Sequence, residues 1–144
     1  MDGGMKTLSC LLLTASLTTA QISMAAESAV AAPADKAATA IRHADPAQAQ
    51  KLIKDEQIVI LDLRTPKEFK AGHLAGAKNI DFTEEDFEAN LAKLDKGKTY
   101  LIHCATGNRS TRSLPAFKKL QFKSVVHLDG GIQAWEKAGK PVEK

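Results

Sequence analysis

The sequence predicts a single α/β domain built on a parallel β-sheet with helices on both faces. Helical and extended segments alternate along residues 41–144, which is the order of consecutive strand–helix–strand units. Residues 58–63 are almost continuously apolar, as expected of a central parallel strand buried on both faces. The length of 144 residues, with 44% hydrophobic and 26% charged side chains, fits one globular domain and leaves little room for a second.

Helix starts are marked by capping signals. Asp45 and Pro46 form an N-cap followed by proline at the first helical position, which opens a helix to about residue 55. Thr65 and Glu68 have the spacing of a capping box at the start of a short helix. Further helices are predicted over residues 83–94, from near Ser110, and from the glycine pair 130–131 to residue 138.

Three more strands complete the predicted sheet elements. They are residues 78–80, 99–103 and 125–128. Each is a short run rich in apolar or β-branched side chains next to turn-forming residues.

The N-terminal segment reads as a signal peptide over residues 1–25. Lys6 precedes a thirteen-residue apolar run at 8–20, and the small-residue pattern of a cleavage site follows at 23–25. The run is too short to cross a bilayer core of about 30 Å as a helix. We expect a periplasmic mature protein that begins near Ala26, with translation starting at Met1 or at Met5. A buried N-terminal helix is the alternative.

Residues 26–40 are rich in alanine and offer few core anchors, so they are expected to form a flexible lead-in to a domain at 41–144. Cleavage would remove Cys10 and leave Cys104 as the only cysteine, without a disulfide partner. A lone thiol is either buried and inert or retained for its reactivity, and the count alone slightly favours the inert state.

The formal charge of +3 comes from interspersed acidic and basic residues. No clustered basic stripe is present, so nucleic acid is not an expected partner. No membrane contact is expected after the signal is removed.

The candidate site is the loop that follows the strand at 99–103, because ligands bind beyond the carboxyl ends of parallel strands. Cys104 is its first residue, and a helix start follows, so successive backbone amides can surround one sulfur atom. Such an environment lowers a thiol pKa below about 8.5 and makes the cysteine nucleophilic. The expected nucleophile is therefore Cys104, and the expected binding residues are Ala105, Thr106, Gly107, Asn108 and Arg109.

Three segments of the chain resemble the rhodanese family of sulfurtransferases. The first is 60–80, with DLR at 62–64, EF at 68–69 and GHLAGA at 72–77. The second is the loop from His103 to Ser110, and the third is LDGG at 128–131 with Trp135, Gly139 and the proline–valine pair at 141–142. They occur in the family's order and spacing over nearly all of residues 41–144.

The resemblance implies a rhodanese-like fold with a central sheet of five parallel strands flanked by helices. It also implies a reaction in which Cys104 takes sulfane sulfur as a persulfide from a donor such as thiosulfate and passes it to cyanide or a thiol. The expected partners are thus a small sulfur-containing anion or thiol, with a protein as a further possible sulfur acceptor. No cofactor is implied.

Two other functions stay open. A non-catalytic persulfide carrier would use the same residues, and the sequence does not separate it from an enzyme. Phosphatases of the same fold have one more residue between cysteine and arginine, whereas four residues separate Cys104 from Arg109 here, which resembles the sulfurtransferase loop. The sequence specifies neither donor, acceptor nor oligomeric state.

Two positions depart from the pattern of thiosulfate-active relatives. Many of those relatives have arginine directly after the cysteine, where this chain has Ala105, so thiosulfate is uncertain as the physiological donor. Pro115 lies within the helix after the loop and should remove one helical hydrogen bond there.

The remaining polar residues receive structural interpretations. Asp62 and Arg64 are expected to form a buried supporting pair near the loop, with Ser110 as a further supporting residue. His73 should bond locally, and His103 should orient the loop without acting as a base. Trp135 is expected in the core and Arg112 near the loop mouth. No cluster of metal ligands is apparent, so no metal is predicted.

Overall fold

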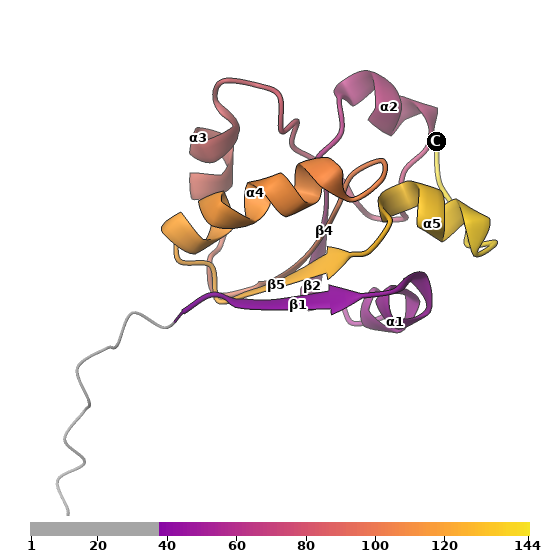
Figure 1. Cartoon of the computed structure of the whole chain (residues 1–144), viewed down its shortest axis with the longest axis horizontal. Helices are drawn as coiled ribbons and strands as arrows, with labels where there is room; N and C mark the ends of the chain where they lie inside the picture. Colours follow the sequence, from indigo (N-terminus) through magenta and orange to yellow (C-terminus); the bar gives the residue numbers. More distant parts are fainter. Residues whose placement is uncertain (1–37) are drawn as a thin grey trace, which may run out of the picture. The chain divides into compact units, whose positions relative to one another are not determined.

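The computed structural model describes residues 38–144 and shows one parallel sheet of five strands (Figure 1). The strands are β1 (Ala40–Ala44), β2 (Ile58–Asp62), β3 (Lys78–Asn79), β4 (Thr99–His103) and β5 (Ser124–Leu128), in the spatial order β1-β5-β4-β2-β3. The expected fold class is confirmed. The signal peptide expected at 1–25 and the lead-in residues 26–37 lie outside the described residues. No helix within 38–144 has the length and apolar character needed to cross a membrane.

In the described part of the chain, five helices cover the sheet. They are α1 (Pro46–Leu52), α2 (Pro66–Ala71), α3 (Phe87–Ala92), α4 (Asn108–Lys119) and α5 (Gly131–Lys137). Helices α3 and α4 lie over one face of the sheet and α1 over the other (Figure 1). Two separate apolar clusters match this division, because one contains Phe87, Leu91 and Phe117 and the other contains Ala49, Ile132 and Trp135.

Strand side chains alternate between the two clusters. In β4, Leu101 joins the cluster of α1 and α5, whereas Ile102 joins the cluster of α3 and α4. Consecutive residues of a strand point to opposite faces, so a strand with both faces covered must be apolar at nearly every position. This accounts for the continuous apolar runs that identify the central strands in the sequence.

Both predicted capping boxes are present. The Asp45 carboxylate accepts from the Gln48 amide at 2.8 Å, and the Gln48 side chain accepts from the Asp45 amide at 3.1 Å. The hydroxyl of Thr65 and the carboxylate of Glu68 make the same reciprocal bonds at the start of α2. Each box satisfies amide groups that the first helical turn leaves without partners.

Several elements differ from the predicted ones. Helix α1 ends at Leu52 and not near residue 55, and β3 and β5 differ by one residue at an end. The edge strand β1 is not among the strands that the sequence patterns predict individually. The helix predicted over 83–94 is shorter, since α3 begins at Phe87, and the Asp81 carboxylate instead holds Thr83 in a turn through bonds of 2.7 and 2.8 Å. Helix α4 begins two residues before Ser110 and continues past Pro115 to Lys119.

Candidate active site

The cysteine loop leaves the central strand β4 at the carboxyl edge of the sheet and is held there by α5. Cys104 follows His103 directly, with β5 on one side of β4 and β2 on the other. The amides of Ile132 and Gln133 donate to the carbonyls of Cys104 and Ala105 at 2.9 and 3.1 Å. The first turn of α5 therefore fixes the backbone of the loop from outside.

The Cys104 sulfur lies inside a ring of donors. The Gly107 amide donates to Sγ at 3.1 Å, and the Ser110 hydroxyl lies 3.6 Å from it. Cys104 is only 1% exposed, and burial by itself opposes the thiolate. The backbone and side-chain hydrogen bonds of Ser110, with the amides of Thr106 and Gly107, outweigh burial and lower the pKa of the Cys104 thiol. The geometry thus favours the nucleophilic form.

Titration of the thiol checks this electrostatic account. In a Cys10→Ser variant, ultraviolet absorbance of the thiolate should report a Cys104 pKa below the ordinary value. Ser110→Ala removes one donor to the sulfur, so it should move the midpoint to higher pH. Ser113→Ala is a suitable control, because the Ser113 hydroxyl bonds the carbonyl of Ser110 and not the sulfur. An unshifted midpoint in Ser110→Ala would contradict the account.

Arg109 is held by a carboxylate of the neighbouring helix. Its two terminal nitrogens donate to both oxygens of Glu68 at 2.7 and 2.8 Å, a bidentate pair that fixes the guanidinium plane. Arg109, one of the expected binding residues, is therefore paired, and Glu68 largely balances its charge. The sequence identified Glu68 only as a helix cap and as part of a family motif. The same carboxylate accepts hydrogen bonds from Thr65 and from Arg109.

This pair makes part of the stability dependent on pH. The Arg109 hydrogen bond lowers the pKa of Glu68 from 4.5 to about 2. A depressed carboxylate pKa contributes stability above the unfolded value, and the contribution disappears as the pH falls toward the folded value. The shift corresponds to roughly 3 kcal/mol at most. Solvent screening of a side chain that is 35% exposed reduces this to about 1 kcal/mol.

We therefore expect Glu68→Gln to lower the free energy of unfolding by about 1 kcal/mol at pH 7. Urea denaturation at several pH values measures the difference from the parent protein, which should shrink between pH 4.5 and about 2. Glu88→Gln is the matched control, because its pair with Lys119 is well exposed and should contribute less. If the difference in unfolding free energy between Glu68→Gln and the parent protein does not change with pH, this assignment is contradicted.

The rest of the loop faces solvent. Thr106 and Asn108 are exposed, and they line an open pocket together with Arg112. The Arg112 guanidinium lies 5.5 Å from the centre of the Phe82 ring, at a cation–π distance. Arg112 is thus at the loop mouth, as predicted.

Asp62 and Arg64 form the buried pair expected from the sequence. Arg64 donates to Asp62 at 2.6 Å and also to the carbonyl of Gly72 at 2.6 Å. The Asn79 side chain donates to the carbonyls of both residues of the pair. These bonds fix the turn between β2 and α2, the helix that carries Glu68. Neither side chain of the pair is hydrogen-bonded to Cys104, which fits a supporting role.

The two other histidines named in the sequence take structural positions. His73 lies 3.0 Å from the carbonyl of Phe69 and stacks on its ring. His103 is fully buried beside Cys104, and burial lowers its pKa more than the nearby Asp62 raises it. The Nε2 atom of His103 has no hydrogen-bond partner in residues 38–144. Within these residues, neither ring nitrogen of His103 is hydrogen-bonded to a thiol or hydroxyl group whose proton it could remove, so a role as general base is not supported.

The structure also brings His43, His127 and Asp129 together, which no pattern in the sequence indicates. His127 lies 2.9 Å from the Ser110 hydroxyl, and its other ring nitrogen lies 3.0 Å from Asp129. His43 contacts the same carboxylate at 2.8 Å. These three residues form a cluster that their spacing in the sequence does not indicate. The sequence does not reveal this contact, because His43 lies in β1 and only the pairing of β1 with β5 places it opposite His127.

A buried cysteine whose sulfur accepts a backbone hydrogen bond, at the carboxyl edge of a five-stranded parallel sheet, is the arrangement expected of rhodanese-fold proteins. Comparison with known families agrees, because the rhodanese-like domain profile matches residues 45–138. The chain therefore belongs to the rhodanese-like sulfurtransferase family.

Individual relatives support this assignment. Thiosulfate sulfurtransferase GlpE of Pseudomonas putida is 37% identical over 99 residues, which cover 68% of this chain and 86% of that protein. The protein named probable adenylyltransferase/sulfurtransferase MoeZ of Mycobacterium tuberculosis is 39% identical over 85 residues, which cover 59% of this chain. The match spans only 22% of that relative's length.

Solved structures show the same fold. The rhodanese-related protein of Thermoplasma volcanium is 31% identical with a TM-score of 0.64, and the alignment covers 71% of this chain and 97% of that one. A protein of Rhodopseudomonas palustris, described as a possible tyrosine phosphatase, is 27% identical with a TM-score of 0.60 over 72% of this chain and 85% of that one.

Proposed function

We propose that this protein is a sulfurtransferase in which Cys104 carries sulfane sulfur as a persulfide. The observation that carries the proposal is the ring of donors from Gly107 and Ser110 around Sγ. A terminal sulfane sulfur is itself an anion, so the same donors stabilise it once it forms. The similarity to a thiosulfate sulfurtransferase supports the same chemistry.

The reaction proceeds in two displacements. The Cys104 thiolate attacks the outer sulfur of the donor, forming an S–S bond while the donor's own S–S bond breaks. With thiosulfate, the leaving group is sulfite, which takes the electron pair of the broken bond. Cyanide or a thiolate then attacks the terminal sulfur, and the electron pair of the Cys104–sulfur bond returns to regenerate the thiolate.

A phosphatase is the second candidate, suggested by the Rhodopseudomonas palustris protein described as a possible tyrosine phosphatase. Such a reaction needs an arginine whose donors hold phosphate oxygens in a bidentate manner. Both terminal nitrogens of Arg109 are already bonded to Glu68, and the loop keeps the shorter sulfurtransferase spacing. We expect hydrolysis of aryl phosphates to stay at background.

The charge balance at the site bears on the donor. Glu68 offsets the Arg109 charge, and the residue after the nucleophile is Ala105, which brings no cation. A dianion such as thiosulfate therefore gains little electrostatic attraction. We propose that the physiological donor has lower charge, such as the persulfide of a small thiol or of a partner protein.

Substituting Ala105→Arg tests this proposal about the donor. The added cation should lower the KM for thiosulfate about tenfold, which corresponds to roughly 1.4 kcal/mol of binding. The KM for an organic persulfide donor, which carries at most one negative charge, should change less. Thiocyanate formation from each donor and cyanide provides the measurement, and Ala105→Gln controls for side-chain size. An equal change for both donors would argue against charge as the cause.

The same assay separates an enzyme from a stoichiometric carrier. An enzyme forms many thiocyanate molecules per protein, whereas a carrier stops after one unless its partner unloads it.

We also propose that the reaction takes place in the periplasm, as the composition of residues 1–25 suggests. N-terminal sequencing of protein from each cell fraction tests that location, and an uncleaved cytosolic chain would remove it.

A further inference from the structure

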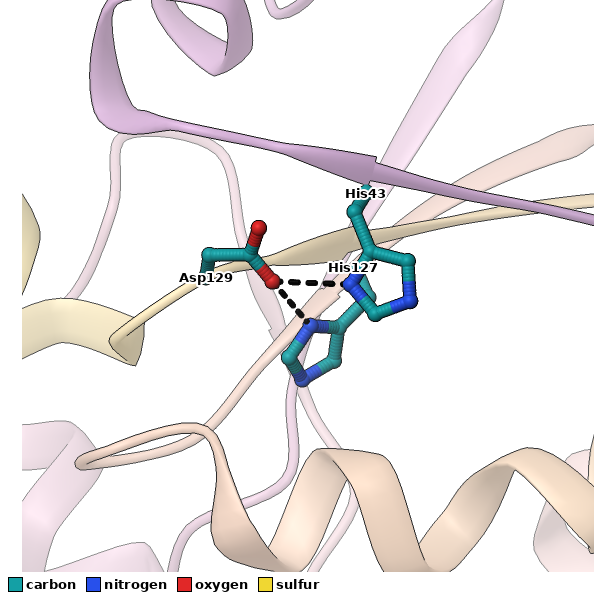
Figure 2. Close-up of side chains that lie close together, drawn as sticks. All are labelled: His43, His127 and Asp129. Atoms are coloured by element: carbon teal, nitrogen blue, oxygen red, sulfur yellow. Dashed lines mark hydrogen bonds and ion pairs between the residues drawn. The ribbon is translucent and has the colours of Figure 1, made fainter.

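His43, His127 and Asp129 meet at the edge of the sheet, beside the cysteine loop (Figure 2). Each offers one ligand atom, and these atoms all lie within 4.8 Å of one another. Figure 2 shows both imidazole rings turned toward the same carboxylate oxygen, with His43 coming from β1 and His127 from β5. The cluster lies outside the ring of donors around the Cys104 sulfur.

The backbone holds this arrangement rigidly. His43 and His127 are register partners in adjacent parallel strands, so their side chains leave the same face of the sheet. The Asp129 amide donates to the carbonyl of Ala44 at 2.9 Å, which extends the pairing by one residue. Sites built on strands keep their ligands in place better than sites on loops.

The surroundings of His127 can accommodate its ring hydrogen on either nitrogen. The imidazole is buried, and Nε2 lies 3.2 Å from the carbonyl of Gly107, a group that only accepts hydrogen bonds. The Thr111 hydroxyl, also 3.2 Å from Nε2, has its own acceptor in that carbonyl at 2.8 Å. The Ser110 hydroxyl, 2.9 Å from Nε2, can donate to that nitrogen when the ring hydrogen is on Nδ1 and is donated to the Asp129 carboxylate, 3.0 Å away. A metal ion on Nδ1 would instead place the hydrogen on Nε2, where the carbonyl of Gly107 can accept it.

Nδ1 and the carboxylate oxygen both carry lone pairs, so their contact needs either a hydrogen on Nδ1 or a metal ion between the two atoms. Ligand atoms around a tetrahedral zinc ion lie about 3.3 Å apart for bond lengths near 2.05 Å. The nitrogen–oxygen distances of 2.8 and 3.0 Å need to lengthen by only about half an ångström. The exposed side chains of His43 and Asp129 leave room for that adjustment.

We propose that His43, His127 and Asp129 form a binding site for one divalent transition-metal ion of the zinc class. The ligands are Nδ1 of each histidine and a carboxylate oxygen of Asp129. Two imidazoles and one carboxylate favour Zn²⁺ or Co²⁺ over Mg²⁺ and Ca²⁺, which prefer oxygen ligands. Three protein ligands leave a fourth position open to water or a small anion.

The site connects to the cysteine through His127. The Ser110 hydroxyl has three possible acceptors, which are the Cys104 sulfur, the carbonyl of Gly107 and Nε2 of His127. A metal ion on Nδ1 fixes the hydrogen on Nε2 and so removes that nitrogen as an acceptor. The hydroxyl is then left to the sulfur and the carbonyl. The ion would thus act on Cys104 through His127 and the Ser110 hydroxyl, and not by direct contact.

Cobalt binding in a Cys104→Ser protein tests the proposal, because this variant cannot bind the ion through the catalytic thiolate. We expect Co²⁺ to give visible absorption of a low-coordinate nitrogen–oxygen site and Zn²⁺ to displace it. In NMR spectra, Zn²⁺ should shift the ring signals of His43 and His127 and leave those of His73 in place.

Ligand variants complete the test. His43→Gln and Asp129→Asn should each weaken Co²⁺ binding at least about tenfold, and both residues are exposed enough for the fold to tolerate the change. The matched controls His73→Gln and Glu136→Gln should bind Co²⁺ as the parent does. Absence of a cobalt spectrum, or equal affinity in the ligand variants and their controls, would show that the cluster holds only protons and would overturn the proposal.

Discussion

Replacing Cys104 with serine should abolish sulfur transfer, lowering the rate of thiocyanate formation by about ten-thousandfold or more. A hydroxyl stays protonated at neutral pH and needs an adjacent base to become a nucleophile. Within residues 38–144, Nε2 of His103 has no hydrogen-bond partner, and Nε2 of His127 contacts the Ser110 hydroxyl and not the sulfur. The donors around Sγ cannot remove a proton from serine, although they can stabilise an anion.

The fold of Cys104→Ser should persist. Serine is close to cysteine in size, and the Gly107 amide that donates to Sγ at 3.1 Å offers the hydroxyl a partner. We expect a loss of stability of about 1 kcal/mol, because a polar group replaces an apolar one in a buried position. Circular dichroism and urea denaturation check the fold beside the kinetic assay. Transfer activity that survives in a folded Cys104→Ser protein would remove Cys104 from the mechanism.

The second large effect concerns Gly131, the first residue of α5. Its φ angle is +60°, and a Cβ atom there would overlap the carbonyl oxygen of Cys104 and lie 2.7 Å from that of Ala105. Both contacts are with backbone, so neither can be relieved by rotating a side chain. Gly131→Ala must push the cysteine loop away from the helix turn that anchors it.

We expect Gly131→Ala to cost about 3–5 kcal/mol of stability and to lower transfer activity in the fraction that still folds. Gly139→Ala is the matched control, because its φ is +69° with no atom within 4 Å of the added Cβ. It should therefore cost only the backbone strain of about 1–2 kcal/mol. Thermal denaturation of both variants provides the comparison. Equal destabilisation would mean that strain alone, and not contact with the loop, makes glycine necessary at 131.

The fold was largely predictable because its central elements leave strong local patterns. Residues 58–61 and 100–102 form continuous runs of aliphatic and aromatic side chains, since both faces of β2 and β4 are covered. The capping boxes at Asp45 and Thr65 mark helix starts through bonds within four residues. Such short-range signals can be recognised in a single sequence.

The missed features depend on contacts distant in sequence. The edge strand β1 is partly exposed and includes Arg42 and His43, so it has no continuous apolar run, and only its pairing with β5 makes it a strand. In the same way, the bidentate bond between Glu68 and Arg109 joins residues 41 positions apart. The location of the cysteine loop was predictable from its own residues, whereas the charge balance around it was not.

The central claim is that Cys104 holds a transferable sulfur atom, and intact-protein mass spectrometry tests it most directly. A Cys10→Ser protein treated with thiosulfate, and separately with an organic persulfide, is weighed before and after addition of cyanide. We predict that the mass rises by one sulfur atom on a peptide containing Cys104 and returns to its starting value as thiocyanate appears. An unchanged mass with every donor, combined with phosphate release that depends on Cys104, would contradict the account.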